Sequence, residues 1–183
     1  MAEPTPLIQR LDAAGAKAAL PELTALLQDA VRSGASLGFL HPLTDSDAAA
    51  YWKGVLQDLA ADHRLLLVAT TPEGIVGTVQ LELAQRPNAS HRAEVQKLFV
   101  ASKYRGRGLG RALMEALDPL AREHGRTLLI LDTREGDAAE RLYAKLGWSR
   151  AGRIPNFARS SAGPLTATVF FYRELPPLEE SGS

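Results

Sequence analysis

Apolar residues recur every three or four positions in four segments of the chain, the spacing of a helix with one buried face. The first segment runs from Ala16 to Val31 and the second from about Asp45 to Ala61. A third follows a glycine-rich turn and ends before a glycine, a residue type that commonly terminates helices. The fourth opens with Asp137 and Glu140, which have the spacing of a capping box, and ends at Gly147. The pattern therefore predicts about four helices.

Between these segments lie short apolar runs with the length and composition of β-strands. Two of them flank Thr71-Pro72-Glu73-Gly74, whose proline and glycine suit a tight turn, so we expect a hairpin there. The run TLLILDT is apolar throughout, as in a strand that is covered on both faces. Strands that alternate with helices predict a mixed α/β sheet. The expected strands are 7–11, 65–71, 74–84, 93–100, 127–133 and 165–175.

The chain has the length of one domain. Its 183 residues contain no repeat and no long linker, so we expect a single domain over 1–183 with a core of about 7–175. Residues 1–6 and the tail from Pro176 are polar and proline-rich, so we expect them to be disordered.

Composition excludes several function classes. There is no cysteine, so disulfides, thiolate metal sites and a cysteine nucleophile are excluded. The formal net charge is zero and aromatic residues are sparse, which argues against nucleic acid as a partner. The four histidines have no metal-ligand spacing. Without a signal sequence or a membrane-spanning run, we expect a cytoplasmic protein with no membrane partner.

The segment RGRGLGR, residues 105–111, combines glycines with arginines directly before a helix. The first turn of a helix has unpaired amide hydrogens and a partial positive charge, and glycines allow a ligand to approach them closely. Such a turn favours a bound phosphate. The spacing matches neither the nucleotide P-loop nor the dinucleotide fingerprint. A tight turn with solvated arginines is the structural alternative.

Two motifs extend this interpretation. The spacing Arg105-x-x-Gly108-x-Gly110 resembles the pyrophosphate loop of the GNAT superfamily of acetyl-CoA-dependent N-acetyltransferases, and it follows a strand as that family requires. The segment RLYAKLGW, residues 141–148, resembles the family's LYxKxGF segment. The resemblance implies acetyl-CoA as cofactor and the GNAT fold. That fold is a mixed, mostly antiparallel sheet of about seven strands flanked by about four helices.

Four segments also resemble the tabtoxin-resistance acetyltransferases, which acetylate a small β-lactam amino-acid toxin. This resemblance implies transfer of an acetyl group to the primary amine of a small, amino-acid-like molecule by direct attack in a ternary complex. Acetylation of a protein N-terminus or lysine is the runner-up, and a non-catalytic acyl-CoA-binding module is a further alternative. A homodimer is left open. The segments are GASLGF (34–39), 85–98, 105–114 and LDT (131–133).

The family resemblance also implies catalytic roles. Tyr143 would lie beside the coenzyme A sulfur and donate a proton to the thiolate, because a tyrosine is protonated at neutral pH; the alternative is a core tyrosine. Glu94 and Asp132 are candidates for the general base that deprotonates the amine, each acting directly or through a water. Glu94 could instead pair with Arg92, and Asp132 could instead bind the substrate's cation.

Further residues are expected to bind the cofactor and the substrate. Many family members have asparagine where this chain has Gly136, so the neighbouring Asp137 is expected to supply that cofactor contact. Backbone groups of the strand before the turn would polarise the acetyl carbonyl. The cofactor-binding candidates are Leu98, Phe99, Val100, Arg105, Gly106, Arg107, Gly108, Leu109, Gly110, Arg111, Asp137 and Tyr143. The substrate-binding candidates are Phe39, Trp52, Asn88 and Arg92, although Trp52 also fits a helical core stripe.

Overall fold

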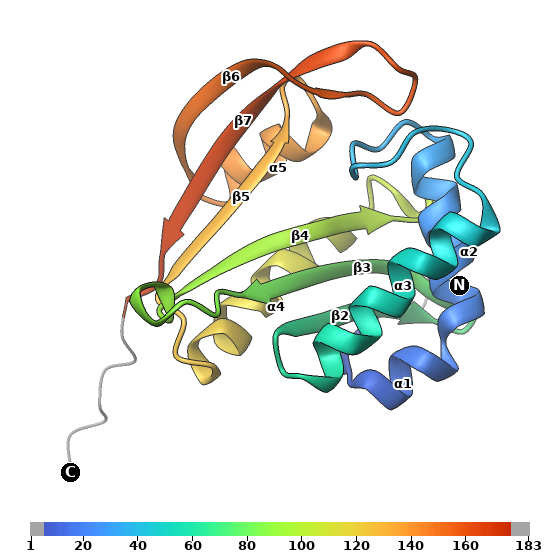
Figure 1. The fold of residues 1–183 in the computed structure, drawn as a ribbon, viewed down its shortest axis with the longest axis horizontal. Coiled ribbons are helices and arrows are strands. Elements are labelled where there is room, and N and C mark those ends of the chain that lie inside the picture. The colour runs from blue at the N-terminus through green and yellow to red at the C-terminus, as the bar shows by residue number, and fades with distance from the viewer. Residues whose placement is uncertain (1–5, 177–183) are drawn as a thin grey trace.

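A seven-stranded sheet forms the centre of the molecule. The computed structural model describes residues 6–176, and the predicted disordered ends lie almost wholly outside that range. The strand order is β1-β2-β3-β4-β5-β7-β6, and every neighbouring pair is antiparallel except β4 and β5 (Figure 1). The predicted mixed, mostly antiparallel sheet of about seven strands is confirmed. Within the described residues no helix is long and apolar enough to cross a membrane.

Six of the seven strands coincide with the predicted apolar runs to within one or two residues. The seventh, β6, was not predicted, because its side chains are almost all exposed and its pairing with β7 is irregular. An exposed, irregular strand carries no hydrophobic alternation that sequence reasoning could find. The strands are β1 (Leu7–Leu11), β2 (Arg64–Thr71), β3 (Gly74–Leu83), β4 (Arg92–Val100), β5 (Leu128–Arg134), β6 (Ser149–Arg159) and β7 (Leu165–Glu174).

Five α-helices flank the sheet, one more than predicted. The predicted first helix is divided at Ala19, which ends one helix and begins the next, and Pro21 lies in the first turn of the second. Proline suits that position because its missing amide hydrogen would have no helical partner there. The helices are α1 (Ala13–Ala18), α2 (Leu20–Arg32), α3 (Asp45–Ala60), α4 (Leu109–Glu123) and α5 (Ala138–Lys145).

The predicted capping box at the start of α5 is wrong in its contacts. Asp137 does occupy the N-cap position, but its side chain makes no capping hydrogen bond. Its Oδ1 accepts instead from Nε and Nη2 of Arg134, at 2.8 and 2.6 Å. The Glu140 carboxylate accepts from the backbone N–H of Gly136 at 2.6 Å. A nearby arginine has therefore displaced the helix amides as the partner of Asp137.

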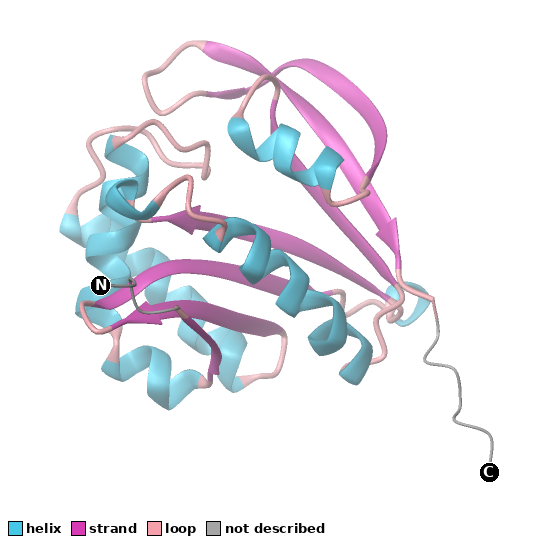
Figure 2. Ribbon diagram, turned by 180° about the vertical axis from the view of Figure 1, so that it is seen from behind, coloured by secondary structure: helices cyan, strands magenta, loops and turns pink. Residues whose placement is uncertain are grey.

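Each face of the sheet has its own apolar core. Helices α1–α3 cover the face seen in Figure 1, and α4 crosses β2–β4 on the face seen in Figure 2. Leu113 and Leu117 of α4 lie in the second of these cores, together with inward residues of the strands. Trp52 of α3 lies at the centre of the first, with no exposed surface. Strands β2–β4 are therefore covered on both faces, as in a layered α/β fold.

Strand β4 contains an irregularity that positions the site. Its register against β3 shifts by one residue between the pairs Gln80–Gln96 and Thr78–Phe99. Lys97, at this β-bulge, has a φ of 54°, which a non-glycine residue seldom adopts. Towards β5 only three pairs form, ending at Glu94–Ile130, and the two strands then separate (Figure 1). The bulge therefore coincides with the point at which the sheet splits.

Candidate active site

The predicted anion-binding turn lies at the N-terminus of α4. Gly106 and Gly108 have φ values of 75° and 81°, and Gly108 is the N-cap. No side chain caps the helix, and a Cβ placed at either glycine would meet nothing within 4 Å. The glycines are therefore required by backbone conformation, and the amides of the first turn have no side-chain cap. A phosphate group fits such a cradle.

The arginine side chains of this turn have partners of their own. Arg105 donates from Nε to the Val100 carbonyl at 3.1 Å and from Nη2 to Ser33 Oγ at 2.8 Å. Arg111 forms an ion pair with Glu115 one helical turn later, at 3.3 Å. Arg107 lies over the ring of Tyr104, 5.2 Å from its centroid. Arg105 thus fastens the turn to the end of β4 and to α2.

The three candidate residues on β4 can contribute only backbone groups to a cofactor. Phe99 is 4% exposed and packs in the core beneath α1–α3. Leu98 and Val100 pack against the core beneath α4. Because pairing with β5 ends at Glu94, the backbone edge of this segment lies beside the split of the sheet. An extended ligand arm could pair with that edge as an added strand does.

Tyr143 projects from α5 into the core beneath α4. It is 5% exposed, and its ring lies 6.0 Å from the rings of both Trp148 and Phe171. Burial raises its pKa well above the usual range, and the negative charges of Asp132 and Asp137 act in the same direction. The hydroxyl therefore keeps its proton at neutral pH and can donate it. Tyr143 is thus a core tyrosine, and its role as the proton donor stays a prediction.

Glu94 and Asp132 lie on the two strands that separate. Glu94 pairs with Ile130. Because side chains alternate along a strand, Asp132, two residues beyond Ile130 on β5, lies on the same face as Glu94. Burial raises the pKa of the Glu94 carboxyl, and the charges of Glu82 and Asp132 raise it further, against a hydrogen bond from Gln96. Asp132 keeps an exposed surface, yet the packing around its carboxyl raises its pKa as well. A raised pKa suits a general base working near neutrality.

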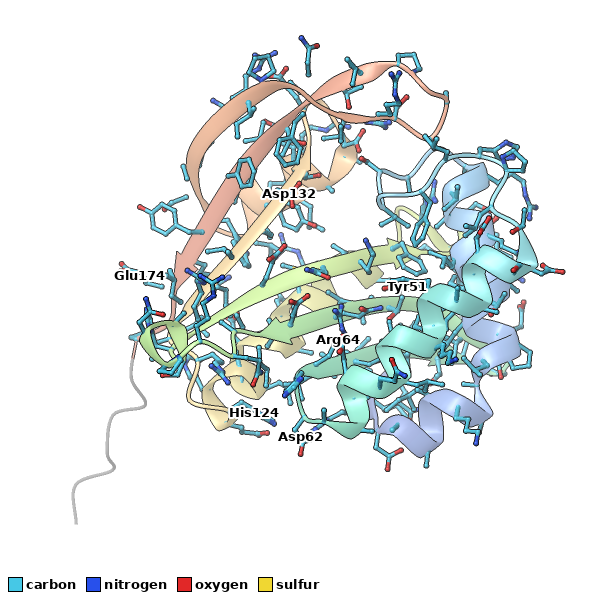
Figure 3. All side chains as sticks on the ribbon, viewed as in Figure 1. Tyr51, Asp62, Arg64, His124, Asp132 and Glu174 are labelled. Atoms are coloured by element: carbon cyan, nitrogen blue, oxygen red, sulfur yellow. The ribbon has the colours of Figure 1, made fainter. Side chains whose placement is uncertain are left out.

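Sequence reasoning missed a set of polar side chains beside these carboxylates. Arg64 donates to Gln80 and Gln96 at 2.8 and 3.1 Å, and it forms ion pairs of 3.0 Å with Asp58 and Glu82. Figure 3 places Tyr51 and Arg64 between α3 and the sheet, and Asp132 on β5. The signal in the sequence was the run of polar residues at alternate positions, Gln80 and Glu82 on one strand and Glu94 and Gln96 on the next.

A second missed residue is Lys97, at the bulge. Its ammonium donates to the Leu37 carbonyl at 2.6 Å and lies 5.4 Å from the Phe39 ring centroid and 5.8 Å from that of Tyr51. Burial lowers its pKa, and so does the charge of Arg64. No periodicity in the sequence predicts this position, because strict alternation along β4 would direct the side chain into the other core.

The four residues predicted to bind substrate lie in different environments. Phe39 lies beside the site, with its ring edge-on to Tyr51 at 5.2 Å. Trp52 is fully buried in the core, so the prediction that it contacts substrate is wrong and the core interpretation holds. Arg92 begins β4, two positions before Glu94, and Asn88 is exposed in a short 3-10 turn. Their roles stay predictions, as does that of Asp137, whose carboxylate Arg134 holds.

Comparison with known proteins identifies the class. A sequence profile of the acetyltransferase (GNAT) family matches residues 24–148. The chain is 33% identical over 141 residues to an uncharacterized N-acetyltransferase of Azospirillum brasilense from the hisH–hisA intergenic region; the match covers 75% of this chain and 82% of that protein.

Solved structures agree with the sequence comparison. Ribosomal-protein-alanine N-acetyltransferase of Brucella melitensis has a TM-score of 0.75 at 27% identity, over 92% of this chain and 99% of that one. The acetyltransferase yncA of Salmonella typhimurium, solved with its cofactor acetyl-CoA, has a TM-score of 0.75 at 20% identity, over 98% of this chain and 99% of that one, and shows the shared fold.

Together these similarities define an acyltransferase. The chain belongs to the acetyltransferase (GNAT) family, and it is an acetyl-CoA-dependent N-acetyltransferase.

Proposed function

We propose that this enzyme moves an acetyl group to the primary amine of a small, amino-acid-like acceptor. The observation that carries the proposal is the pair of carboxyls with raised pKa, Glu94 on β4 and Asp132 on β5, beside the point where these strands separate. The buried Tyr143 lies within reach of the charge of Asp132. These are the groups that direct attack of an amine on a thioester requires. With these groups both proton transfers would proceed without a covalent intermediate, so we propose direct attack in a ternary complex.

Acetyl-CoA supplies the thioester, and the chain's own residues hold it and move the protons. The amides following Gly108 would hold the pyrophosphate, and Arg105 would keep that turn against β4. Backbone groups of Leu98 to Val100 would align the pantetheine arm. Glu94 or Asp132 takes a proton from the substrate ammonium, so that the amine nitrogen can form its bond to the acetyl carbon. Tyr143 would give its proton to the sulfur as the carbon–sulfur bond breaks, and the second proton of the attacking nitrogen would return to the tyrosine oxygen through solvent.

The loop between α2 and α3 supports a small acceptor. Its residue His41 donates its backbone N–H to the Ser161 carbonyl in the β6–β7 turn at 2.9 Å. Arg134 at the end of β5 donates to the Gly34 carbonyl of the same loop at 3.3 Å. The loop therefore bridges both halves of the split sheet (Figure 1). A long peptide lying across that end of the sheet would have to break this bridge, whereas a small molecule would not.

Acetylation of a protein N-terminus is the second candidate. Its support is the similarity to the ribosomal-protein-alanine N-acetyltransferase of Brucella melitensis. Resistance to a β-lactam toxin, action in the cytoplasm and the organisation of residues 7–175 as one domain are parts of the first proposal. The first follows from the sequence resemblance, and the other two follow from the composition and length of the chain.

The proposal is tested by following thiol release from acetyl-CoA with a panel of acceptors. The panel contains amino acids, β-lactam amino acids, polyamines and short peptides with free N-termini, and calorimetry follows acetyl-CoA binding in parallel. We expect turnover with small amines that carry a carboxylate. Faster turnover with alanine-initiated peptides would favour the second candidate instead. Tight acetyl-CoA binding without turnover on any amine would contradict both.

The pH dependence of the reaction tests the general base. We expect Glu94→Gln to lower kcat/KM about 10²-fold near neutral pH, because an amide cannot accept the proton. In the unmodified enzyme kcat/KM should fall as the pH drops through a pKa above the usual glutamate range, since the protonated carboxyl is no base. The variant should lack this acidic limb when pH–rate profiles are compared.

The controls for this experiment separate the two carboxylates. Glu123→Gln, at the exposed end of α4, should leave the profile unchanged. If Glu94→Gln keeps the acidic limb and Asp132→Asn loses it, the base is Asp132. Unchanged affinity for acetyl-CoA in each variant excludes a general loss of structure.

A further inference from the structure

Lys97 owes its position to the bulge in β4. On a regular strand its side chain would follow Ala93 and Val95 into the core beneath α4. The extra residue and the φ of 54° turn it to the opposite face, beside Gln96. A left-handed conformation is unfavourable for a residue with a side chain, and such strain gathers at functional sites. The fold thus accepts a local strain that places an ammonium group beside the catalytic carboxylates.

The surroundings of Lys97 are those of a cation that is only partly satisfied. An ammonium has three donors, and within residues 6–176 its one hydrogen bond is to the Leu37 carbonyl. The Phe39 and Tyr51 rings face it at 5.4 and 5.8 Å, a distance at which aromatic faces attract cations. No carboxylate of the described chain lies within ion-pairing distance of it, although the charges of Glu94, Asp132 and Glu82 act on it.

Arg64, a second cation of this region, already has ion-pair partners. Arg64 forms ion pairs with both Asp58 and Glu82, and two glutamines accept from the same guanidinium. Among the described charged groups at the split of the sheet, Lys97 is therefore the cation with donors to spare. Glu94 and Asp132 are the facing anions. This arrangement of charges is complementary to a zwitterion.

We propose that Lys97 binds the carboxylate of the acceptor while the acceptor's amino group lies towards Glu94 and Asp132. The inference rests on the proposed function and narrows it to acceptors that carry a free carboxylate close to the reacting amine. Arg92 and Asn88, the polar residues predicted from the sequence to bind substrate, lie at and before the start of β4, further from the split. Phe39 and Tyr51 would then line the acceptor's path beside the ammonium.

The test compares each acceptor amino acid with its own primary amide. The amide has nearly the same size and keeps the amino group, but it lacks the negative charge of the carboxylate. The measured quantity is the ratio of kcat/KM for the acid to kcat/KM for the amide. In the unmodified enzyme we expect this ratio to be about 30 or more, which is the range of a charge-assisted hydrogen bond. Lys97→Met should reduce the ratio to near 1, and Lys97→Arg should restore most of it.

A merely structural role for Lys97 would give a different result. If Lys97 only anchors the loop at Leu37, Lys97→Met would lower both kcat/KM values equally, and the ratio would not change. Lys53→Met, an exposed lysine on α3, is the matched control and should leave both rates as they were. Thermal unfolding and acetyl-CoA affinity show whether each variant is folded.

The outcomes also distinguish this inference from the proposed function. An unmodified enzyme that acetylates amino acids and their amides equally well would overturn the inference and leave acetyl transfer to a small amine standing. An enzyme that acetylates no small amine would overturn both. If Lys97→Met still prefers the acid to the amide, the inference is wrong and another cation binds the acceptor's carboxylate.

Discussion

Tyr143→Phe is expected to lower kcat by about 10²-fold to 10⁴-fold, the usual contribution of a positioned proton donor. Burial and two neighbouring carboxylates raise the pKa of this tyrosine, so its hydroxyl is protonated at any pH at which the enzyme works. The variant keeps the ring that packs against Trp148 and Phe171, so the core should be undisturbed. Only the proton for the leaving sulfur is lost. Steady-state kinetics would measure kcat, and calorimetry would measure acetyl-CoA affinity.

The comparison of these two quantities decides the role of Tyr143. If Tyr143 is the acid, kcat falls while the affinity for acetyl-CoA stays within about threefold, because the hydroxyl acts in the transition state rather than in the ground state. Equal losses in both would make it a cofactor-binding residue. An acetyl thioester whose thiol has a lower pKa than that of coenzyme A should partly rescue the variant. Such a thiolate can leave without being protonated by Tyr143.

Gly108→Val is expected to abolish measurable binding of acetyl-CoA, as followed by calorimetry. Gly108 has a φ of 81°, and a β-branched residue in that conformation is strained by about 1–3 kcal/mol. A side chain there would meet no other atom within 4 Å, so the core would not be disturbed and the fold should persist. The strain is relieved most easily by reshaping the turn, and the amides at the start of α4 would then no longer point at one phosphate group.

The opposite end of α4 offers a matched control. Gly125 has a φ of 68° and equally open surroundings, so Gly125→Val introduces a similar strain far from the turn. Both variants should lose similar stability in thermal unfolding, but only Gly108→Val should lose cofactor affinity. Unchanged affinity in Gly108→Val would remove the pyrophosphate from this turn and leave only solvated arginines there.

Local pattern was sufficient for most of the fold. Apolar residues at helical or alternating spacing report the burial of one face, and burial is what stabilises an element in its place. For that reason α3, α4 and six strands were predicted within one or two residues. The turn before α4 was also readable, because glycines at positive φ are a local requirement of the backbone. Both motifs that indicated an acetyltransferase are local in the same sense.

Other features depend on contacts between distant segments. Asp137 turned to Arg134 rather than to the amides of its own helix, because a charged partner outcompetes a neutral one. Trp52 was ambiguous on a helical stripe until the packing of α1–α3 against the sheet enclosed it. Strand β6 exists because β7 offers it an edge to pair with, and its own exposed residues give no sign of it.

The candidate active site depends both on local sequence pattern and on contacts between distant segments. The family resemblance indicated proton-transfer roles for Glu94, Tyr143 and Asp132, and these roles stay predictions. The raised pKa values of Glu94 and Asp132 arise only in the folded protein, where the two carboxyls are partly buried on the strands that pair for three residues and then separate. Lys97 could not be found in advance, because its direction is set by a bulge, which forms only between two paired strands. Burial and charge coupling are properties of the assembled sheet, so tertiary structure decided them.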